Sequence, residues 1–241
     1  MNILPVISTL VSFVFAGVVF RRYQVKGGTH LAMWAIGLFL YGLGTLSEVI
    51  LSLTFSELML KIWYVSGAML TAAWLGQGTF YLLIRRKRLV HGFAIGLAAL
   101  SLVSIILIAA SPITSAAGSF IPSQPVSGQY KDILTRSGII TALTIIQNIY
   151  GTILMIGGAL YSAYLFWRKQ VLLNRVIGNL FIAAGALSPA MAGSFVKAGL
   201  VDILYVSELV GAILMLIGFQ FAVSRRQAED PVKVQATSGH N

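Results

Sequence analysis

The sequence predicts an all-α integral membrane protein, a seven-transmembrane helix bundle with its N-terminus outside and its C-terminus in the cytoplasm. Hydrophobic residues make up 57% of the 241 residues and charged residues only 10%, against about 25% charged residues in soluble domains. A 25.9 kDa globule of this composition has too few polar side chains to cover its surface. Lipid is therefore the expected surroundings, and the cell membrane the expected location.

Seven segments are long enough to cross a bilayer, which requires about 20 mainly apolar residues. They cover residues 3–20, 31–53, 58–84, 89–110, 138–167, 175–199 and 203–224. The first segment lacks a basic start and runs directly into Arg21 and Arg22, so we expect a retained helix rather than a signal peptide. Residues 1–226 then form one membrane domain, and the polar stretch 227–241 is expected to be a disordered cytoplasmic tail.

The positions of the basic residues predict the orientation. Four lie on the N-terminal side of the membrane, namely Lys61, Lys131, Arg136 and Lys197. Thirteen lie at the opposite ends of the segments, namely Arg21, Arg22, Lys26, Arg85, Arg86, Lys87, Arg88, Arg168, Lys169, Arg175, Arg225, Arg226 and Lys233. Cytoplasmic connections carry the excess of Lys and Arg, so the side with thirteen is the cytoplasmic one.

Composition and spacing argue against several function classes. The net charge of +10 is spread in short clusters at segment ends, whereas a nucleic-acid-binding face gathers its cations on one surface. The chain has no cysteine, which removes disulfides and thiolate metal sites. Its histidines (His30, His91 and His240) lie at segment ends or in the tail, so neither a metal centre nor a haem is expected. We expect a protein that is not an enzyme and that carries no cofactor.

Residues 36–85 align without gaps to residues 177–226, at an offset of 141. Twelve of the fifty positions are identical, including Gly37 with Gly178 and Gly44 with Gly185. A tripeptide Tyr-Val-Ser is shared as well, at 64–66 and 205–207. If real, this is a parallel 3+1+3 internal repeat with the fourth segment as linker; the alternative is similarity imposed by apolar composition.

Polar groups inside a bilayer are costly, and they mark functional sites more often than casual positions. Five such residues are candidates for ligand binding, namely Glu48, Glu208, Asn148, Tyr150 and Lys61. One interpretation is a polar pocket that opens outward between the segments. The other is a pair of structural ion pairs, Glu48 with Lys61 and Glu208 with Lys197, or lysines that reach the lipid headgroups. For the lysines we favour the second interpretation.

Two further features bear on movement. Pro189 lies in the middle of the sixth segment, where it removes a helical hydrogen bond; it is a candidate hinge, with a plain kink as the alternative. The long connection 111–137 is rich in Pro, Ser and Gly, and we expect it to be a mobile loop rather than a lid. Glycines at helix-packing spacing, including the Gly92–Gly96 pair, are expected to serve packing within the bundle rather than a dimer.

Residues of the second and third segments resemble a known family. The order Trp34, Tyr41, Glu48, then Lys61-x-Trp63-Tyr64, then Trp74-Leu75, Tyr81 and a basic end is similar to the seven-transmembrane N-terminal sensor region of bacterial histidine kinases. The resemblance covers roughly residues 5–90. No kinase domain follows Arg226 in this sequence, so the resemblance implies a sensing module that acts through a partner.

These observations leave three functions open. The first is a receptor-like or sensory module that reads a small ligand or lipid at the outward-facing pocket and acts through a membrane or cytoplasmic partner. The second is a small-solute transporter with a parallel repeat, although Pro5 and Pro189 are not at related positions, as the prolines of such carriers are. The third is a structural subunit of a membrane complex.

Overall fold

The computed structural model describes residues 3–169, 173–197 and 202–223, and these residues are almost entirely helical. The first half contains α1 (Ile3–Lys26), α2 (Thr29–Leu51), α3 (Glu57–Trp63), η1 (Tyr64–Leu70), α4 (Thr71–Leu83) and α5 (Lys87–Ala110). A connection follows with η2 (Ser115–Ser119) and α6 (Val126–Ile133). The second half contains α7 (Gly138–Thr152), η3 (Ile153–Gly157), α8 (Gly158–Arg168), α9 (Leu173–Lys197) and α10 (Asp202–Val223).

Among the described residues, six helical runs are long and apolar enough to cross a membrane, which is compatible with a multi-pass membrane protein. They are Ile3–Lys26, Thr29–Leu51, Glu57–Leu83, Lys87–Ala110, Gly138–Arg168 and Ile203–Val223. Their bounds agree with six of the seven expected segments to within a few residues, apart from the first, which continues to Lys26. The sixth expected segment, 175–199, corresponds to α9, and its residues 198 and 199 lie outside the described ones. The predicted tail 227–241 also lies outside the described residues.

Two of these runs are α-helices interrupted by π-helical turns. The run Glu57–Leu83 is π-helical over η1, and the run Gly138–Arg168 is π-helical over η3. A π turn inserts an extra residue into the ladder of backbone hydrogen bonds and often marks a functional site. Apolar periodicity does not reveal such turns, so they could not be predicted from the sequence.

The helices form a closed ring in which most neighbours in the chain are neighbours in space. Helix α1 packs against α2, and α2 against the run from α3 to α4; α8 packs against α9, and α9 against α10. The ring closes through two contacts, α4 with α7 and α1 with α10. Helix α5 stands outside it, against α4 and α7. Outside these contacts α5 faces away from the ring, so most of its apolar side chains are exposed to the surroundings of the bundle.

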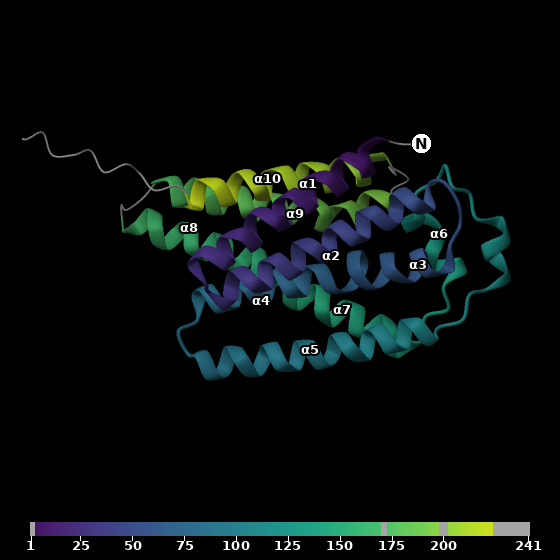
Figure 1. Cartoon of the computed structure of the whole chain (residues 1–241), viewed down its shortest axis with the longest axis horizontal. Coiled ribbons are helices and arrows are strands. Elements are labelled where there is room, and N and C mark those ends of the chain that lie inside the picture. The colour runs from purple at the N-terminus through teal and green to yellow at the C-terminus, as the bar shows by residue number, and fades with distance from the viewer. Residues whose placement is uncertain (1–2, 170–172, 198–201, 224–241) are drawn as a thin grey trace, which may run out of the picture.

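The connection 111–137 lies at the end of the bundle where the chain begins, and the tight turns from α1 to α2 and from α4 to α5 lie at the other (Figure 1). The turn from α1 to α2 is made by Gly27 and Gly28, with φ of 66° and 103°, values that favour glycine because a Cβ would clash with the backbone. We call the end with α6 the N-terminal end of the bundle. The basic clusters at 21–26 and 85–88 lie at the opposite end, as the orientation argument expected.

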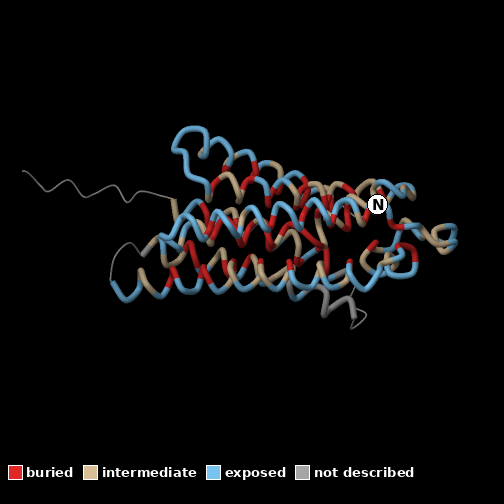
Figure 2. The backbone as a smooth tube through the Cα atoms, turned by 90° about the horizontal axis from the view of Figure 1, so that it is seen from below, coloured by how far each residue is buried: buried red, intermediate tan, exposed pale blue. Residues whose placement is uncertain are grey.

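Burial follows the inward faces of the helices, while their outer faces are exposed (Figure 2). One hydrophobic cluster, which we call the inner cluster, closes the half of the ring away from α6. Its members are Phe15, Ala16, Val19, Leu31, Ala35, Leu38, Leu75, Met155, Met215 and Phe219. Both halves of the chain contribute to it, so it ties the two ends of the sequence together.

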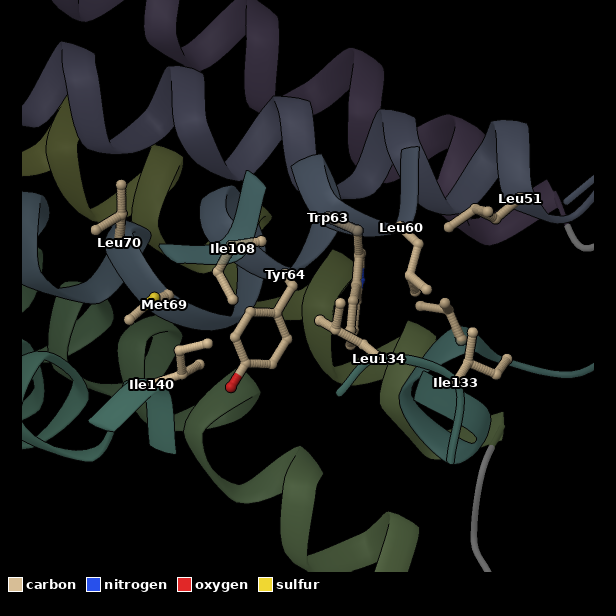
Figure 3. Close-up of a cluster of buried hydrophobic side chains, with 11 residues drawn as sticks. Leu51, Leu60, Trp63, Tyr64, Met69, Leu70, Ile108, Ile133, Leu134 and Ile140 are labelled. Carbon is tan, nitrogen blue, oxygen red and sulfur yellow. The ribbon is translucent and has the colours of Figure 1, made fainter. Parts of the chain in front are cut away.

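The connection 111–137 is a folded cap rather than the mobile loop expected from its composition. Val126 and Ile133 of α6 and the following Leu134 are buried in a second cluster with Leu60 and Trp63 (Figure 3). The backbone of the connection is also tied at its base by an isolated bridge between residues 113 and 134. Burying these apolar side chains stabilises the cap by about 1.5 to 3 kcal/mol for each side chain buried in full.

Glycines let the helices of the ring approach closely. A Cβ on Gly151 of α7 would lie 2.1 Å from the carbonyl carbon of Ala72, and one on Gly44 of α2 would lie 2.8 Å from the Cα of Gly67. In contrast, Gly92 and Gly96 of α5 have nothing within 4 Å. The expectation of internal packing therefore holds for Gly44 and Gly151, and fails for the pair on α5 because that face meets no other described helix.

The substitution Gly151→Leu tests the contact between α7 and the start of α4. The leucine must push the two backbones apart, and overpacking of this kind costs about 1 to 3 kcal/mol, so we expect the melting temperature of the detergent-solubilised protein to fall by roughly 3 to 10 °C. Gly96→Leu makes the same chemical change on the open face of α5 and should leave the melting temperature nearly unchanged. Equal shifts for the two variants would contradict the packing described here.

Candidate functional site

A cavity of about 510 Å³ lies inside the ring, in the half that α6 covers. Six elements of the ring and the cap contribute to its wall: α2, the run from α3 to α4, α6, the run from α7 to η3, α9 and α10. Its volume falls in the range of about 300 to 1,000 Å³ that is typical of small-molecule sites. The polar side chains in its wall are those of Tyr41, Thr45, Glu48, Trp63, Thr71, Ser127, Tyr130, Lys131, Asn148, Thr152 and Glu208.

Glu48 reaches the cavity from the last turn of α2, and only 3% of its surface is exposed. The indole Nε1 of Trp63 donates a 2.8 Å hydrogen bond to its Oε1 atom. Its Oε2 atom is buried and has no donor within reach among the described residues. Buried polar atoms are nearly always hydrogen-bonded in proteins, so this oxygen is an acceptor that the described residues leave unused, on a residue that lines the cavity.

Glu208 enters the cavity from the opposite wall, two turns into α10. Its Oε2 atom is also buried without a donor among the described residues. Tyr41, two turns before Glu48 on the same face of α2, donates a 2.8 Å hydrogen bond from its hydroxyl to the backbone carbonyl of Glu208. This bond fixes α10 against α2 at the level of the carboxyl group.

The carboxyl groups of Glu48 and Glu208 lie close enough to interact with each other electrostatically. Two buried carboxylates at this separation cannot both keep their charge without a compensating cation. The pair is therefore the electrostatic centre of the cavity.

Asn148 lines the cavity from α7 and supports the π-helical segment η1. Its Nδ2 atom donates to the carbonyl of Ala68 at 2.8 Å and to the carbonyl of Thr144 at 2.9 Å. The hydroxyl of Thr71 donates to the carbonyl of Ser66 at 2.7 Å. A π turn disturbs the regular ladder and leaves carbonyls in need of donors, and these two side chains supply them. What Asn148 still offers to a ligand is its carbonyl oxygen.

The mouth of the cavity is covered by α6, through Ser127, Tyr130 and Lys131. The ring of Tyr130 packs on that of Trp63, with centroids 5.1 Å apart, and the guanidinium of Arg136 lies 4.9 Å from its centre on the outside. Burial raises the pKa of the Tyr130 hydroxyl above its usual value of 10, and the positive charge of Arg136 opposes the rise. At neutral pH this tyrosine is an uncharged hydrogen-bonding group.

The cavity ends at the inner cluster. Leu75, Met155 and Met215 belong both to its wall and to that cluster. Below them, the indole Nε1 of Trp34 donates to the carbonyl of Leu75 at 3.1 Å and to the Thr79 hydroxyl at 3.3 Å. The cavity is thus closed by packed apolar side chains on one side and by a single short helix on the other.

Of the five ligand-binding candidates, Glu48, Glu208 and Asn148 come together in the cavity, and Lys61 and Tyr150 do not line it. Lys61 pairs with Glu57 at 2.6 Å and donates to the carbonyl of Ala109 at the end of α5, at 3.0 Å. The expected pair of Glu48 with Lys61 is therefore wrong, because Glu57, one helical turn away on the same face, holds the lysine instead.

Tyr150 faces the opposite side of α7 from Asn148, since two residues correspond to about 200° around a helix. Its hydroxyl donates to Oε1 of Gln77, and its ring stacks on that of Phe93 with centroids 6.3 Å apart. It thus joins α7 to α4 and α5. The expected partner of Glu208, Lys197, has a side chain outside the described residues.

Pro189 lines the cavity from α9, which is helical on both sides of it. Its ring packs where a Cβ of Gly211 would lie, 2.8 Å from the proline Cδ. Proline leaves the carbonyl four residues earlier without its helical donor, and that carbonyl, of Gly185, lies against Gly211 as well. The hinge remains a prediction, since its position beside the cavity suits a plain kink equally.

Tyr41, Trp63 and Tyr130 take part in the site and were not among its candidates. Tyr41 and Glu48 are seven residues apart, a spacing that places both on one face of a helix, so the sequence contained a signal for the tyrosine. For Tyr130 there was none, because its position depends on how the connection folds.

Comparison of the chain with family models, with curated proteins and with solved structures finds no match.

The bond from Trp63 to Glu48 can be observed directly by NMR of the ¹⁵N-tryptophan-labelled protein, which has four indole signals. Loss of the acceptor in Glu48→Leu should move the Trp63 indole proton upfield, because the proton is no longer deshielded by a carboxyl oxygen. Glu48→Gln, which keeps an acceptor, should produce a smaller shift. Glu57→Leu removes a carboxylate outside the cavity and should leave the signal in place; an unmoved signal in Glu48→Leu would exclude the bond.

Proposed function

We propose that this chain is a receptor-like membrane protein that binds a small ligand in the cavity between α2, η1, α7, α9 and α10. The observation that carries the proposal is a pair of carboxyl groups, Glu48 and Glu208, that line a cavity of ligand size and that each have one buried oxygen without a donor among the described residues. A purely structural subunit has no need of such a site, and retaining unsatisfied acceptors in a bundle costs stability. Binding of a ligand would satisfy them.

In this proposal the protein crosses the cell membrane seven times, with α9 as the remaining span. The N-terminal end of the bundle, with α6, faces outward, and the basic clusters face the cytoplasm. The cavity then opens outward beneath α6, where an external solute or a lipid from the outer leaflet can enter. The excess of basic residues at the opposite end supports this orientation.

The likeness of the Trp34, Tyr41 and Glu48 pattern to kinase sensor regions favours a sensing role. Two of these residues carry the site: Glu48 lines the cavity and Tyr41 holds α10 beside it. A ligand that changes the contact between Glu48 and Glu208 would alter the fit of α2 against α10. A signal would then pass through that contact to a membrane or cytoplasmic partner.

Transport of a small solute is the second candidate, and the order of helices in the ring favours it. If the first three spans are exchanged with the last three, the contact of α4 with α7 becomes the contact of α10 with α1, as a parallel repeat requires. Gly37 and Gly44 of α2 pack against the next span, and so do Gly178 and Gly185 of α9. These shared contacts support the 3+1+3 repeat.

The proposal predicts that a small molecule purifies with the protein and that blocking the cavity removes it. Ala186→Phe, in the cavity wall, fills the space, whereas Ala184→Phe adds the same ring on the exposed face of α9. Mass spectrometry of small molecules released from the protein in nanodiscs should find a ligand in wild type and Ala184→Phe and lose it in Ala186→Phe. A ligand retained in all three would exclude the cavity as its site.

Flux measurements separate the two candidate functions. In proteoliposomes, a receptor is expected to show no net uptake of the ligand found above. Uptake that Glu48→Gln abolishes would overturn the receptor proposal in favour of transport.

The orientation can be tested in intact cells because the chain has no cysteine of its own. A membrane-impermeant maleimide should label Ser123→Cys, in the connection before α6, and should leave Gln24→Cys, at the other end of the bundle, unlabelled until the cells are opened. The reverse pattern would invert the topology.

A further inference from the structure

Several polar groups that remain free in the cavity wall are acceptors. Most donors of the ring helices are already used within the protein: the Trp63 indole by Glu48, the Tyr41 hydroxyl by the Glu208 carbonyl, and both N–H groups of Asn148 by backbone carbonyls. The Thr71 hydroxyl donates to the carbonyl of Ser66. Two carboxyl oxygens and one amide oxygen are left as acceptors in the ring, and further donors, the hydroxyls of Ser127 and Tyr130 and the ammonium group of Lys131, lie on α6 at the mouth.

The charge of the cavity also favours a ligand that donates hydrogen bonds. Glu48 and Glu208 have no basic partner among the residues that the structure describes, where the one ion pair joins Lys61 to Glu57 outside the cavity. Lys131 lies at the mouth, on α6, with its side chain exposed to solvent. Buried carboxylates without a partner attract a cation or a proton, and a bound anion would meet repulsion from both.

The remaining wall suits an organic ion rather than a bare metal ion. Tyr41, Trp63 and Tyr130 line the same cavity as the carboxyl groups, and aromatic rings attract ammonium groups. Leu75, Met155, Ile156 and Met215 form an apolar lining, and Leu204, one turn before Glu208 on α10, adds to it. A volume of about 510 Å³ accommodates a hydrocarbon group of six to ten carbon atoms beside the charged one, on the order of a small drug-like ligand.

From these three observations we infer that the cavity binds a small organic ammonium ion. Its N–H groups donate to Glu48, Glu208 and the Asn148 carbonyl oxygen, and its hydrocarbon part lies against the apolar lining. This inference rests on the proposed function and specifies the class of its ligand. It also explains why two carboxyl groups meet inside an apolar ring: together they provide the negative charge that one ammonium group requires.

The test uses three probes of one shape and different charge: cyclohexylammonium, cyclohexanol and cyclohexanecarboxylate, at constant ionic strength. Each is titrated into the ¹⁵N-tryptophan-labelled protein, and the Trp63 indole signal is followed, because that indole donates to Glu48. We expect saturable shifts with cyclohexylammonium and none with the other two. In Glu48→Gln and Glu208→Gln the affinity should fall roughly 10- to 100-fold, as expected for loss of a charge-assisted hydrogen bond.

Glu57→Gln, a surface carboxylate, and Ala184→Phe, on the exposed face of α9, are the matched controls and should bind the ammonium probe as wild type does. Ala186→Phe should abolish binding. Should one of the Glu→Gln variants fail to fold, the other variant and Ala186→Phe still decide the matter, with the melting temperature as the check on folding.

The outcomes also separate the inference from the function on which it rests. If cyclohexanol binds as tightly as cyclohexylammonium and Ala186→Phe abolishes both, the cavity is a ligand site without charge selection, and the ammonium inference is overturned alone. Unchanged ammonium binding in both Glu→Gln variants overturns it as well. If no probe shifts the signal, the inference is wrong; the absence of any co-purified ligand would then count against the proposed function separately.

Discussion

Two carboxyl groups that face each other inside an apolar ring of helices impose the strictest condition on this structure. Each must be held in place, given some of its hydrogen bonds and kept apart from lipid, because an exposed carboxylate in hydrocarbon is far costlier than one in a polar cavity. The structure meets these needs with few groups. Trp63 donates to Glu48, Tyr41 fixes the backbone of Glu208, and the cap that contains α6 separates the site from its surroundings. One oxygen of each carboxyl group is left without a donor among the described residues.

The irregular helices around the cavity follow from the same condition. A straight α-helix packed at glycine contacts leaves no room beside it, since the contacts at Gly44 and Gly151 bring backbones together directly. The π segments η1 and η3 lie next to these contacts along their helices. They shift the following residues around the helix axis. Asn148 and Thr71 then satisfy carbonyls of η1. These polar side chains thus satisfy backbone carbonyls with their donors, and only their remaining acceptors are left for a ligand.

The sequence was sufficient to predict most of the fold, and only part of the site. Length and hydropathy located the six spans because a bilayer imposes one length on every segment. Glu48, Glu208 and Asn148 were chosen because a polar group in such a segment is conspicuous, and all three line the cavity. Lys61 and Tyr150, chosen in the same way, lie elsewhere, and a ligand-binding role stays a prediction for all five. Lys61 is bound by Glu57, and Tyr150 by Gln77. Which partner a side chain reaches depends on the helix face on which it lies and on local geometry, and composition does not show either.

The folded state of the connection 111–137 was beyond prediction for a related reason. Its Pro, Ser and Gly content describes a chain that is free to bend, and such content is equally compatible with a packed cap and a mobile loop. What decides between them is the apolar surface below, presented by Leu60 and Trp63 on a different helix. Such long-range complementarity appears only when the helices are placed side by side.

The two closures of the cavity differ in kind, and this difference bears on how the protein works. If the 141-residue offset reflects a repeat, Glu48 corresponds to Pro189 and Gly67 to Glu208, and all four residues line the cavity. The two halves have therefore diverged at the site itself, with one carboxyl group in each at a different level. The inner closure joins side chains of both halves, among them Leu75, Met155 and Met215. Opening it requires the halves to separate along their whole contact.

The closure at the other end depends on one helix of eight residues, α6. Its apolar side chains pack on Leu60 and Trp63, so opening this end breaks that packing while the contacts between the ring helices stay in place. A ligand that enters from this side meets Trp63 and Tyr130 first and the carboxyl pair next. In the proposed function its binding energy is then available at the contact between α2 and α10, which Tyr41 already spans. Opening at α6 breaks fewer contacts than separating the halves, and this difference fits the proposed receptor better than a transporter, since alternating access needs comparable free energies for its two open states.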